Sequence, residues 1–236
     1  MIYSDDEIAA YLSDAELLLQ DFWGATDNDE RSTLYVELAD ILKPLAEPEN
    51  STPVAAYFMG SVAESLARQL DKHPRHSADR MRLFYEAADY YHIAGALAPY
   101  DEDAALVAKY SLGMLYADNL VVVPNGRDPN KEAFTMLKEA AEAGLADASV
   151  MLSIMYKTGR GTEQNDERAL YWMERADEHK AELNSRALDV LNEQLPDMRL
   201  TASVASEVQQ AFQNLRRPLS PRGALEVRAR LAGGPH

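Results

Sequence analysis

Two nine-residue stretches decide the fold: AKYSLGMLY at residues 108–116 and ASVMLSIMY at residues 148–156. Aligned at an offset of 40 residues, they share Ala, Leu and Tyr at the same places. Each is followed by a loop and a second related stretch, AFTMLKEA at 133–140 and ALYWMERA at 169–176, at an offset of 36. This pattern is typical of an internal repeat of two helices, with a loop that is four residues shorter in the later copy.

The residue types explain how such a pair of helices would pack. Small residues such as Gly113 and Ala140 let two helices approach closely, and leucines such as Leu112 fill the space between them. Tyr116 and Tyr156 are able to bury the ring while the hydroxyl keeps a polar partner. A single pair cannot bury its whole apolar face, so successive pairs are expected to stack into a solenoid.

The repeat resembles the Sel-one-like repeats, a class related to tetratricopeptide repeats. The resemblance is carried in the first copy by Leu112, Gly113, Tyr116, Lys131, Ala133, Ala140, Ala141 and Gly144, and in the second by Leu152, Tyr156, Gly159, Gly161, Asp166, Ala169, Trp172 and Ala176. Ser153 replaces the helical glycine of the second copy, and Lys180 stands where its closing glycine would be. Over residues 105–180, the resemblance implies a right-handed α-solenoid of stacked antiparallel helix pairs that acts as a protein-interaction adaptor without catalysis.

The rest of the chain also shows helical periodicity, and no segment has the pattern of a sheet strand. A degenerate earlier copy is visible at 55–60, followed by 86–88, although Ala63 stands at its tyrosine position. We therefore expect the solenoid to cover residues 1–196. Helices are expected at about 4–24, 34–45, 53–72, 77–97, 102–118, 130–144, 146–158 and 166–195.

Composition excludes several classes of function. The chain lacks cysteine, which rules out disulfides, zinc–thiolate sites and cysteine nucleophiles. Its net charge of −16 disfavours nucleic-acid binding and favours a basic protein partner or simply a well-solvated surface. The sequence shows neither a secretory signal nor an apolar run long enough to span a membrane, so a cytoplasmic location is expected.

The charge is unevenly distributed along the chain. Residues 197–236 hold six Arg and three acids, a net of +3, which leaves a net of −19 on the remainder. Pro196 ends the packed pattern, and an amphipathic stretch follows at 201–215. This C-terminal segment is interpreted either as a capping helix for the last pair or as a basic arm that docks on an acidic surface.

The sequence gives little support to an active site. Two histidines in the polar loop 71–76 are weak candidates for metal binding. The Gly159-Arg-Gly161 stretch follows a helix rather than a strand and lacks the Lys-Ser/Thr of a phosphate loop. We therefore expect no catalytic residues, no metal and no cofactor, and the chain is interpreted as a protein that is not an enzyme.

A partner-binding surface is the more promising kind of site. In stacked pairs the first helix lines the concave face, and residues on it outside the core stripe are candidates for contacting a partner protein. Those residues are Tyr110, Met114, Ser149, Val150, Ser153 and Lys157. Val121 and Val122, in an apolar loop, either tuck under the next pair or form a contact patch. The runner-up to the adaptor function is an acidic inhibitor, an immunity protein or a chaperone for a basic effector protein.

Overall fold

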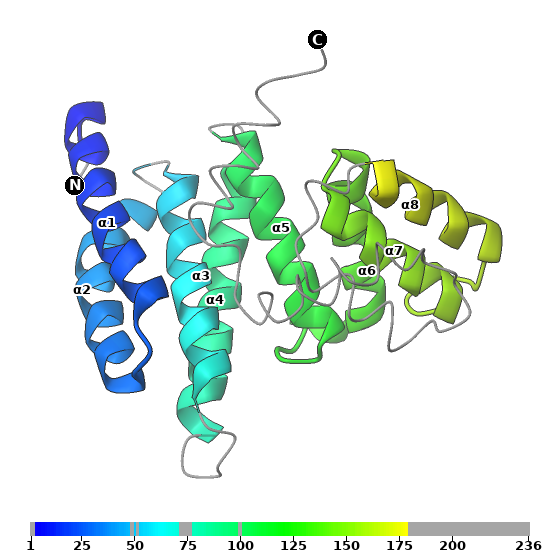
Figure 1. Ribbon diagram of the computed structural model, residues 1–236, viewed down its shortest axis with the longest axis horizontal. Helices are drawn as coiled ribbons and strands as arrows, with labels where there is room; N and C mark the ends of the chain where they lie inside the picture. The colour runs from blue at the N-terminus through cyan, green and yellow to red at the C-terminus, as the bar shows by residue number, and fades with distance from the viewer. Residues whose placement is uncertain (1–2, 48–49, 51, 71–76, 99–100, 179–236) are drawn as a thin grey trace. The chain divides into compact units, whose positions relative to one another are not determined.

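The computed structural model describes residues 3–47, 50, 52–70, 77–98 and 101–178, and every regular element among them is helical (Figure 1). The elements are α1 (Asp5–Gly24), α2 (Asn28–Ala46), α3 (Pro53–Gln69), α4 (Ser77–Ala96), α5 (Glu102–Ala117), the 3-10 helix η3 (Pro124–Gly126), α6 (Pro129–Glu142), α7 (Ala146–Thr158) and α8 (Asp166–Glu178). The expected all-α class is confirmed. The expected continuation of the last helix to 195, the position of Lys180 and the whole segment 197–236 lie outside the described residues.

Local capping chemistry fixes where the helices begin and end. At the start of α1, Ser4 and Glu7 form a capping box: the Ser4 amide donates to Glu7 Oε2 at 2.8 Å, and the Glu7 amide donates to Ser4 Oγ at 3.4 Å. Asp27 caps α2 by accepting from the amide of Glu30. At the end of α7, Gly159 takes a left-handed conformation (φ +70°), which costs a glycine almost nothing.

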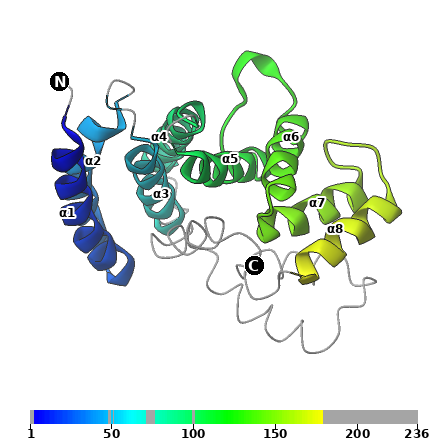
Figure 2. The ribbon, with the colours of Figure 1, turned by 90° about the horizontal axis from the view of Figure 1, so that it is seen from above.

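The described residues fall into two compact units, one extending to Ser111 and the other beginning at Leu112. In the first unit α1 packs on α2, α2 on α3, and α3 most extensively on α4; in the second, α6 packs on α7 and α7 on α8 (Figure 2). Within each unit a helix therefore contacts its neighbours in chain order. Such nearest-neighbour packing of helix pairs is the architecture of an α-solenoid.

The two clear copies of the repeat pair their helices through the same close contact. In α5, a Cβ added to Gly113 would lie 3.6 Å from the carbonyl oxygen of Ala133 in α6. In α7, Ser153 takes the equivalent position, and its Oγ donates to the carbonyl oxygen of Ala169 in α8 at 2.8 Å. The serine thus replaces a glycine without opening the pair, because its hydroxyl bonds to the backbone that the glycine only approaches.

The pair α3–α4 also places a helical glycine against the backbone of its second helix, but in a different register: the alignment of 86–88 makes Ala87 the counterpart of Ala140, whereas Gly113 lies against Ala133, two turns earlier. A Cβ added to Gly60 of α3 would lie 3.1 Å from the carbonyl oxygen of Ala87 and 2.6 Å from ring atoms of Tyr91, both in α4. The first helix has Ala63 where the later copies have tyrosine. A buried tyrosine is supplied instead by the second helix as Tyr91, and Gly60 leaves the space for its ring.

The close approach of α5 and α6 at Gly113 predicts that leucine destabilises the chain more at Gly113 than at Gly95, another helical glycine. Leucine at Gly113 would overlap Met136 Cβ and Leu137 Cγ, both already 3.3 Å from an added Cβ, and should cost roughly 1–3 kcal/mol of unfolding free energy through overpacking. A Cβ added to Gly95 would meet only Lys109 Cγ, at 3.6 Å, which belongs to a flexible side chain. We therefore expect Gly113→Leu to lower the melting temperature and Gly95→Leu to leave it nearly unchanged. Equal losses would contradict the proposed helix pairing.

Candidate interaction surfaces

The residues expected to line an open concave face are mostly buried. Every side chain of α7 from Ala146 to Tyr156 is buried, and five of the predicted partner-binding residues are less than a tenth exposed: Tyr110, Met114, Ser149, Val150 and Ser153. The expectation that these side chains form an open face is therefore corrected. For the α7 residues the physical reason lies in the helix itself, since nearly all of its side chains are apolar or small, and a helix of that kind is a buried helix. Their contact with a partner stays a prediction and would require them to become accessible.

Polar groups at these positions are used within the α7–α8 pair. The Oγ of Ser149 is 3.5 Å from the carbonyl oxygen of Leu145, to which it donates, and Ser153 bonds across to α8 as described. Lys157 is only partly exposed, and its Nζ lies 3.1 Å from a carboxylate oxygen of Asp166 at the start of α8. The contacts of Ser153 and Lys157 join α7 to α8, whereas that of Ser149 is local to the start of α7, so all three residues already have partners inside the fold.

The sequence left open whether Val121 and Val122 are buried or form a contact patch, and their exposure in the structure distinguishes the two alternatives. Val121 and Val123 are 5% and 2% exposed, whereas Val122 between them is 71% exposed. The loop is thus anchored by two valines, and a single apolar side chain projects outward. A patch of two adjacent valines does not form, because successive residues of an extended segment point in opposite directions.

The residues assigned to the repeat itself are all found in the packed pairs. Leu112, Tyr116, Ala140, Leu152, Tyr156, Trp172 and Ala176 are buried. The Tyr156 hydroxyl accepts from Arg168 at 3.1 Å, while its ring meets Phe134 edge-on at 5.3 Å. Gly144, at φ +97°, follows the last turn of α6 and donates to the carbonyl of Ala141.

Gly161 supports a contact between successive pairs. It has φ +72°, and a Cβ there would overlap the carbonyl oxygen of Asn130 at the start of α6. Beside it, Arg160 Nε donates to Asn130 Oδ1 at 2.6 Å. The loop that follows α7 is therefore seated on α6, and both a left-handed backbone and the absence of a side chain are needed at Gly161.

Sequence reasoning missed a buried polar cluster between α3 and α4. Glu64 and Arg68 form an ion pair at 2.7 Å with most of both side chains buried, and the Tyr91 hydroxyl donates to Glu64 Oε2 at 2.9 Å. Burial, followed by the nearby Glu64 charge, raises the pKa of Tyr91 well above its usual value and raises that of Tyr57 as well. The signal was present in the sequence: Glu64 is the only charged residue in 53–67. The cluster ties the two helices together through a paired carboxylate.

The most accessible candidate surface is the helical hairpin α1–α2. Residues 5–46 contain 11 acidic and 2 basic residues, a net of −9, and α1 has no Lys or Arg at all. Both cations are occupied, because Arg31 is buried and donates to the Ala25 carbonyl, and Lys43 pairs with Glu86 at 2.8 Å. The carboxylates are all exposed: Asp5, Asp6, Glu7, Asp14, Glu16, Asp21, Asp27, Asp29, Glu30, Glu37 and Asp40.

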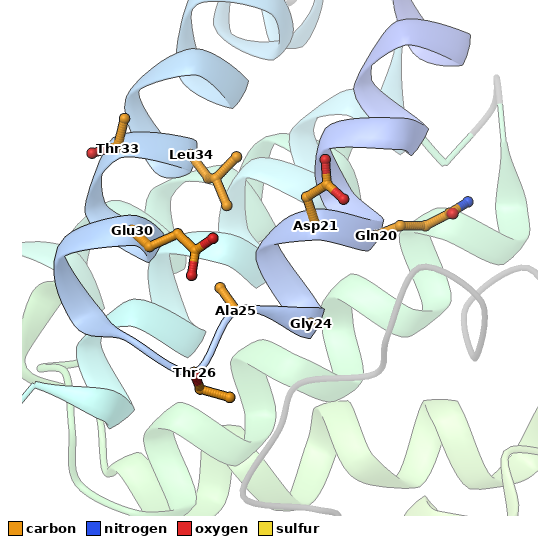
Figure 3. A pocket seen from close by; sticks show the side chains of 8 residues that line it. All are labelled: Gln20, Asp21, Gly24, Ala25, Thr26, Glu30, Thr33 and Leu34. Atoms are coloured by element: carbon orange, nitrogen blue, oxygen red, sulfur yellow. The ribbon is translucent and has the colours of Figure 1, made fainter.

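A hollow of about 570 Å³ lies where the two helices of this hairpin meet. Figure 3 shows Asp21 extending from α1 and Glu30 and Leu34 from α2 around it. On neighbouring turns Leu17 and Val36 are exposed. Two carboxylates and nearby apolar side chains therefore border an open hollow on the surface of the hairpin.

Other kinds of site find no support in the part of the chain that the structure describes. There, three or more His, Asp or Glu side chains do not gather anywhere in a way that would hold a metal ion. Nor does any helix of the described ranges combine the length and apolar character needed to cross a membrane.

Comparison with known proteins finds a likeness in structure but none in sequence. No protein-family model matches the chain, and no curated protein matches it. Among solved structures, a Sel1 repeat protein from Oxalobacter formigenes is similar at 16% identity and a TM-score of 0.34, covering 97% of this chain and 73% of that one. At this TM-score the likeness adds nothing to the fold, which rests on the helices and contacts described above.

Proposed function

We propose that this chain is a non-catalytic scaffold of the Sel-one-like repeat type that binds a basic protein through the α1–α2 hairpin. The observation that carries the proposal is the exposed carboxylate surface of that hairpin, with its two cations already engaged and a hollow between its helices. Charge on such a surface accelerates association and selects partners of opposite sign. The exposed Leu17 and Val36 would supply apolar contact area.

The second candidate is a dedicated acidic inhibitor, immunity protein or chaperone for one basic effector. The same carboxylate surface favours it, and the two functions differ in the number of partners and in affinity. An inhibitor has a single tight partner, whereas an adaptor has several partners of moderate affinity. In both cases binding should weaken as salt rises, because the screening length falls to about 3 Å at 1 M salt.

The proposal is tested by neutralising part of the hairpin. One variant of the full chain carries Asp14→Asn, Glu16→Gln, Asp21→Asn and Glu30→Gln; a matched control neutralises four exposed acids elsewhere, Asp79→Asn, Asp89→Asn, Glu139→Gln and Glu163→Gln. Partners are captured from a lysate of the source organism at low and high salt and quantified by mass spectrometry.

The expected result is that salt-sensitive partners are depleted about tenfold or more with the hairpin variant, a loss of about 1.4 kcal/mol of binding free energy, and are retained with the control. Equal depletion by both variants would mean that only net charge matters. Retention by both would show that binding uses a different surface. A single partner would favour the inhibitor.

A further inference from the structure

The last described helix, α8, leaves an apolar face uncovered. Its buried stripe of Ala169, Trp172 and Ala176 packs on α7, while Leu170 and Tyr171 are 56% and 50% exposed. Glu167 and Glu174 lie one turn away on either side and are also exposed. Residues at these spacings share one side of a helix, so α8 presents two apolar side chains between two carboxylates.

The repeat shows what should cover this face. At the offset of 36 residues, Leu170 of α8 corresponds to Phe134 of α6. Phe134 is covered by the pair that follows it, since its ring meets Tyr156 of α7 at 5.3 Å and its Cβ is close to Gly161 in the next loop. Leu170 stands at the same register of the last described pair, so its exposure marks the place where a following element would pack.

We propose that residues 201–217 of this same chain dock on α8 as that following element. Their sequence repeats apolar residues at helical spacing: Val204, Val208, Ala211, Phe212 and Leu215. The connection from α8, residues 179–200, is 22 residues long, enough to return to α8. A tether of this length keeps the segment at high effective concentration, so modest contact area suffices for docking.

Charge supports the same occupant. At the preceding junction Arg160 donates to Asn130, in the first turn of α6, at 2.6 Å. The residue of α8 at that register is Asp166, whose carboxylate is 62% exposed although it also contacts Lys157. The proposed occupant ends in Arg216 and Arg217; it has a net charge of +1, and the longer segment 197–236 has a net charge of +3. Its arginines would meet the carboxylates of α8, which gives orientation, while apolar burial supplies most of the affinity.

The absence of cysteine makes a direct test possible in the full chain. Leu170→Cys introduces a single thiol on the proposed face, and Leu17→Cys introduces one on an exposed position of α1 as the control. Maleimide labelling should be about tenfold slower at position 170 than at position 17, corresponding to about 1.4 kcal/mol of docking free energy. Adding Phe212→Asp should abolish that protection, whereas Gln213→Asp, on the opposite side of the predicted helix, should preserve it.

A second measurement identifies the occupant with only a conservative change in its apolar stripe. The double variant Leu170→Cys/Val208→Cys, treated with a short bismaleimide, should give a cross-link within one chain. A cross-linked dimer would show that a second copy covers α8 and would overturn the proposal. Equal labelling rates at positions 170 and 17 would also overturn it, because the face would then be open in the intact chain.

Discussion

Replacing Gly161 by alanine is expected to lower the free energy of unfolding by roughly 2–5 kcal/mol, since it combines left-handed backbone strain with overpacking. The residue has φ +72°, and an added Cβ would overlap the carbonyl of Asn130 and lie 3.1 Å from Phe134 Cβ. Neither neighbour yields easily, because one is helix backbone and the other is the first side-chain atom. Urea-induced unfolding followed by circular dichroism measures the loss.

Gly126 provides the matched control for that prediction. It has a similar φ of +66°, but nothing lies within 4 Å of a Cβ placed on it. Gly126→Ala should therefore cost only the backbone strain of about 1–2 kcal/mol. If the two substitutions destabilise the chain equally, the loop after α7 is not seated on α6 as described.

Arg68→Met is expected to have the second large effect, roughly 3–5 kcal/mol, because it leaves a buried carboxylate without its cation. Glu64 is only 6% exposed in its side chain, and Arg68 is 18% exposed. Methionine keeps much of the apolar stem but removes the charge and the guanidinium group, whose carbon lies 5.8 Å from the centre of the Phe84 ring. The loss should appear in the urea midpoint or the melting temperature.

Two further variants separate the buried charge from general disruption. Arg82→Met removes an arginine from another i,i+4 pair, with Glu86 and in the reverse order, but the Arg82 side chain is 64% exposed and the contact is 3.6 Å. It should cost no more than about 0.5 kcal/mol. Adding Glu64→Leu to Arg68→Met should recover part of the loss, since the unpaired charge is then gone. A double variant as unstable as the single one would argue against an electrostatic cause.

The positions of most helices could be predicted because the relevant signals are local, although α2 begins at Asn28, six residues before the expected start at 34. Ser4 and Glu7 mark the start of α1, and Gly159 marks the end of α7 through its own backbone preference. The pairing of helices followed from residue size, as at Gly113. The likeness of the stretch around Gly60 to the two clear copies was harder to see, because the tyrosine ring next to Gly60 belongs to Tyr91 of the second helix, α4.

The surfaces could not be predicted in the same way, because exposure depends on what packs against a helix from elsewhere. Ser149 and Ser153 were predicted to lie on the surface because they fall outside the core stripe of their helix, yet each hydroxyl has a backbone acceptor within the pair. The apolar neighbours Val150, Ile154 and Met155 were the sign that α7 is enclosed on every side. The acidic character of the α1–α2 hairpin is visible in the sequence, whereas its hollow depends on how the two helices meet.

The seating of the Gly159–Gly161 loop on α6 has a consequence for cooperativity. In an array of repeats, stability is a sum of terms for each unit and for each junction, and weak junctions let one unit open while its neighbour stays closed. Here the junction is made by backbone as well as side chains, since Gly161 rests against the carbonyl of Asn130. Separation of α7 from α8 would displace this loop and remove its contact with the first turn of α6. The α7–α8 pair and α6 should thus behave as one foldon: a local opening that begins in α7–α8 should extend across the boundary between the repeats into α6.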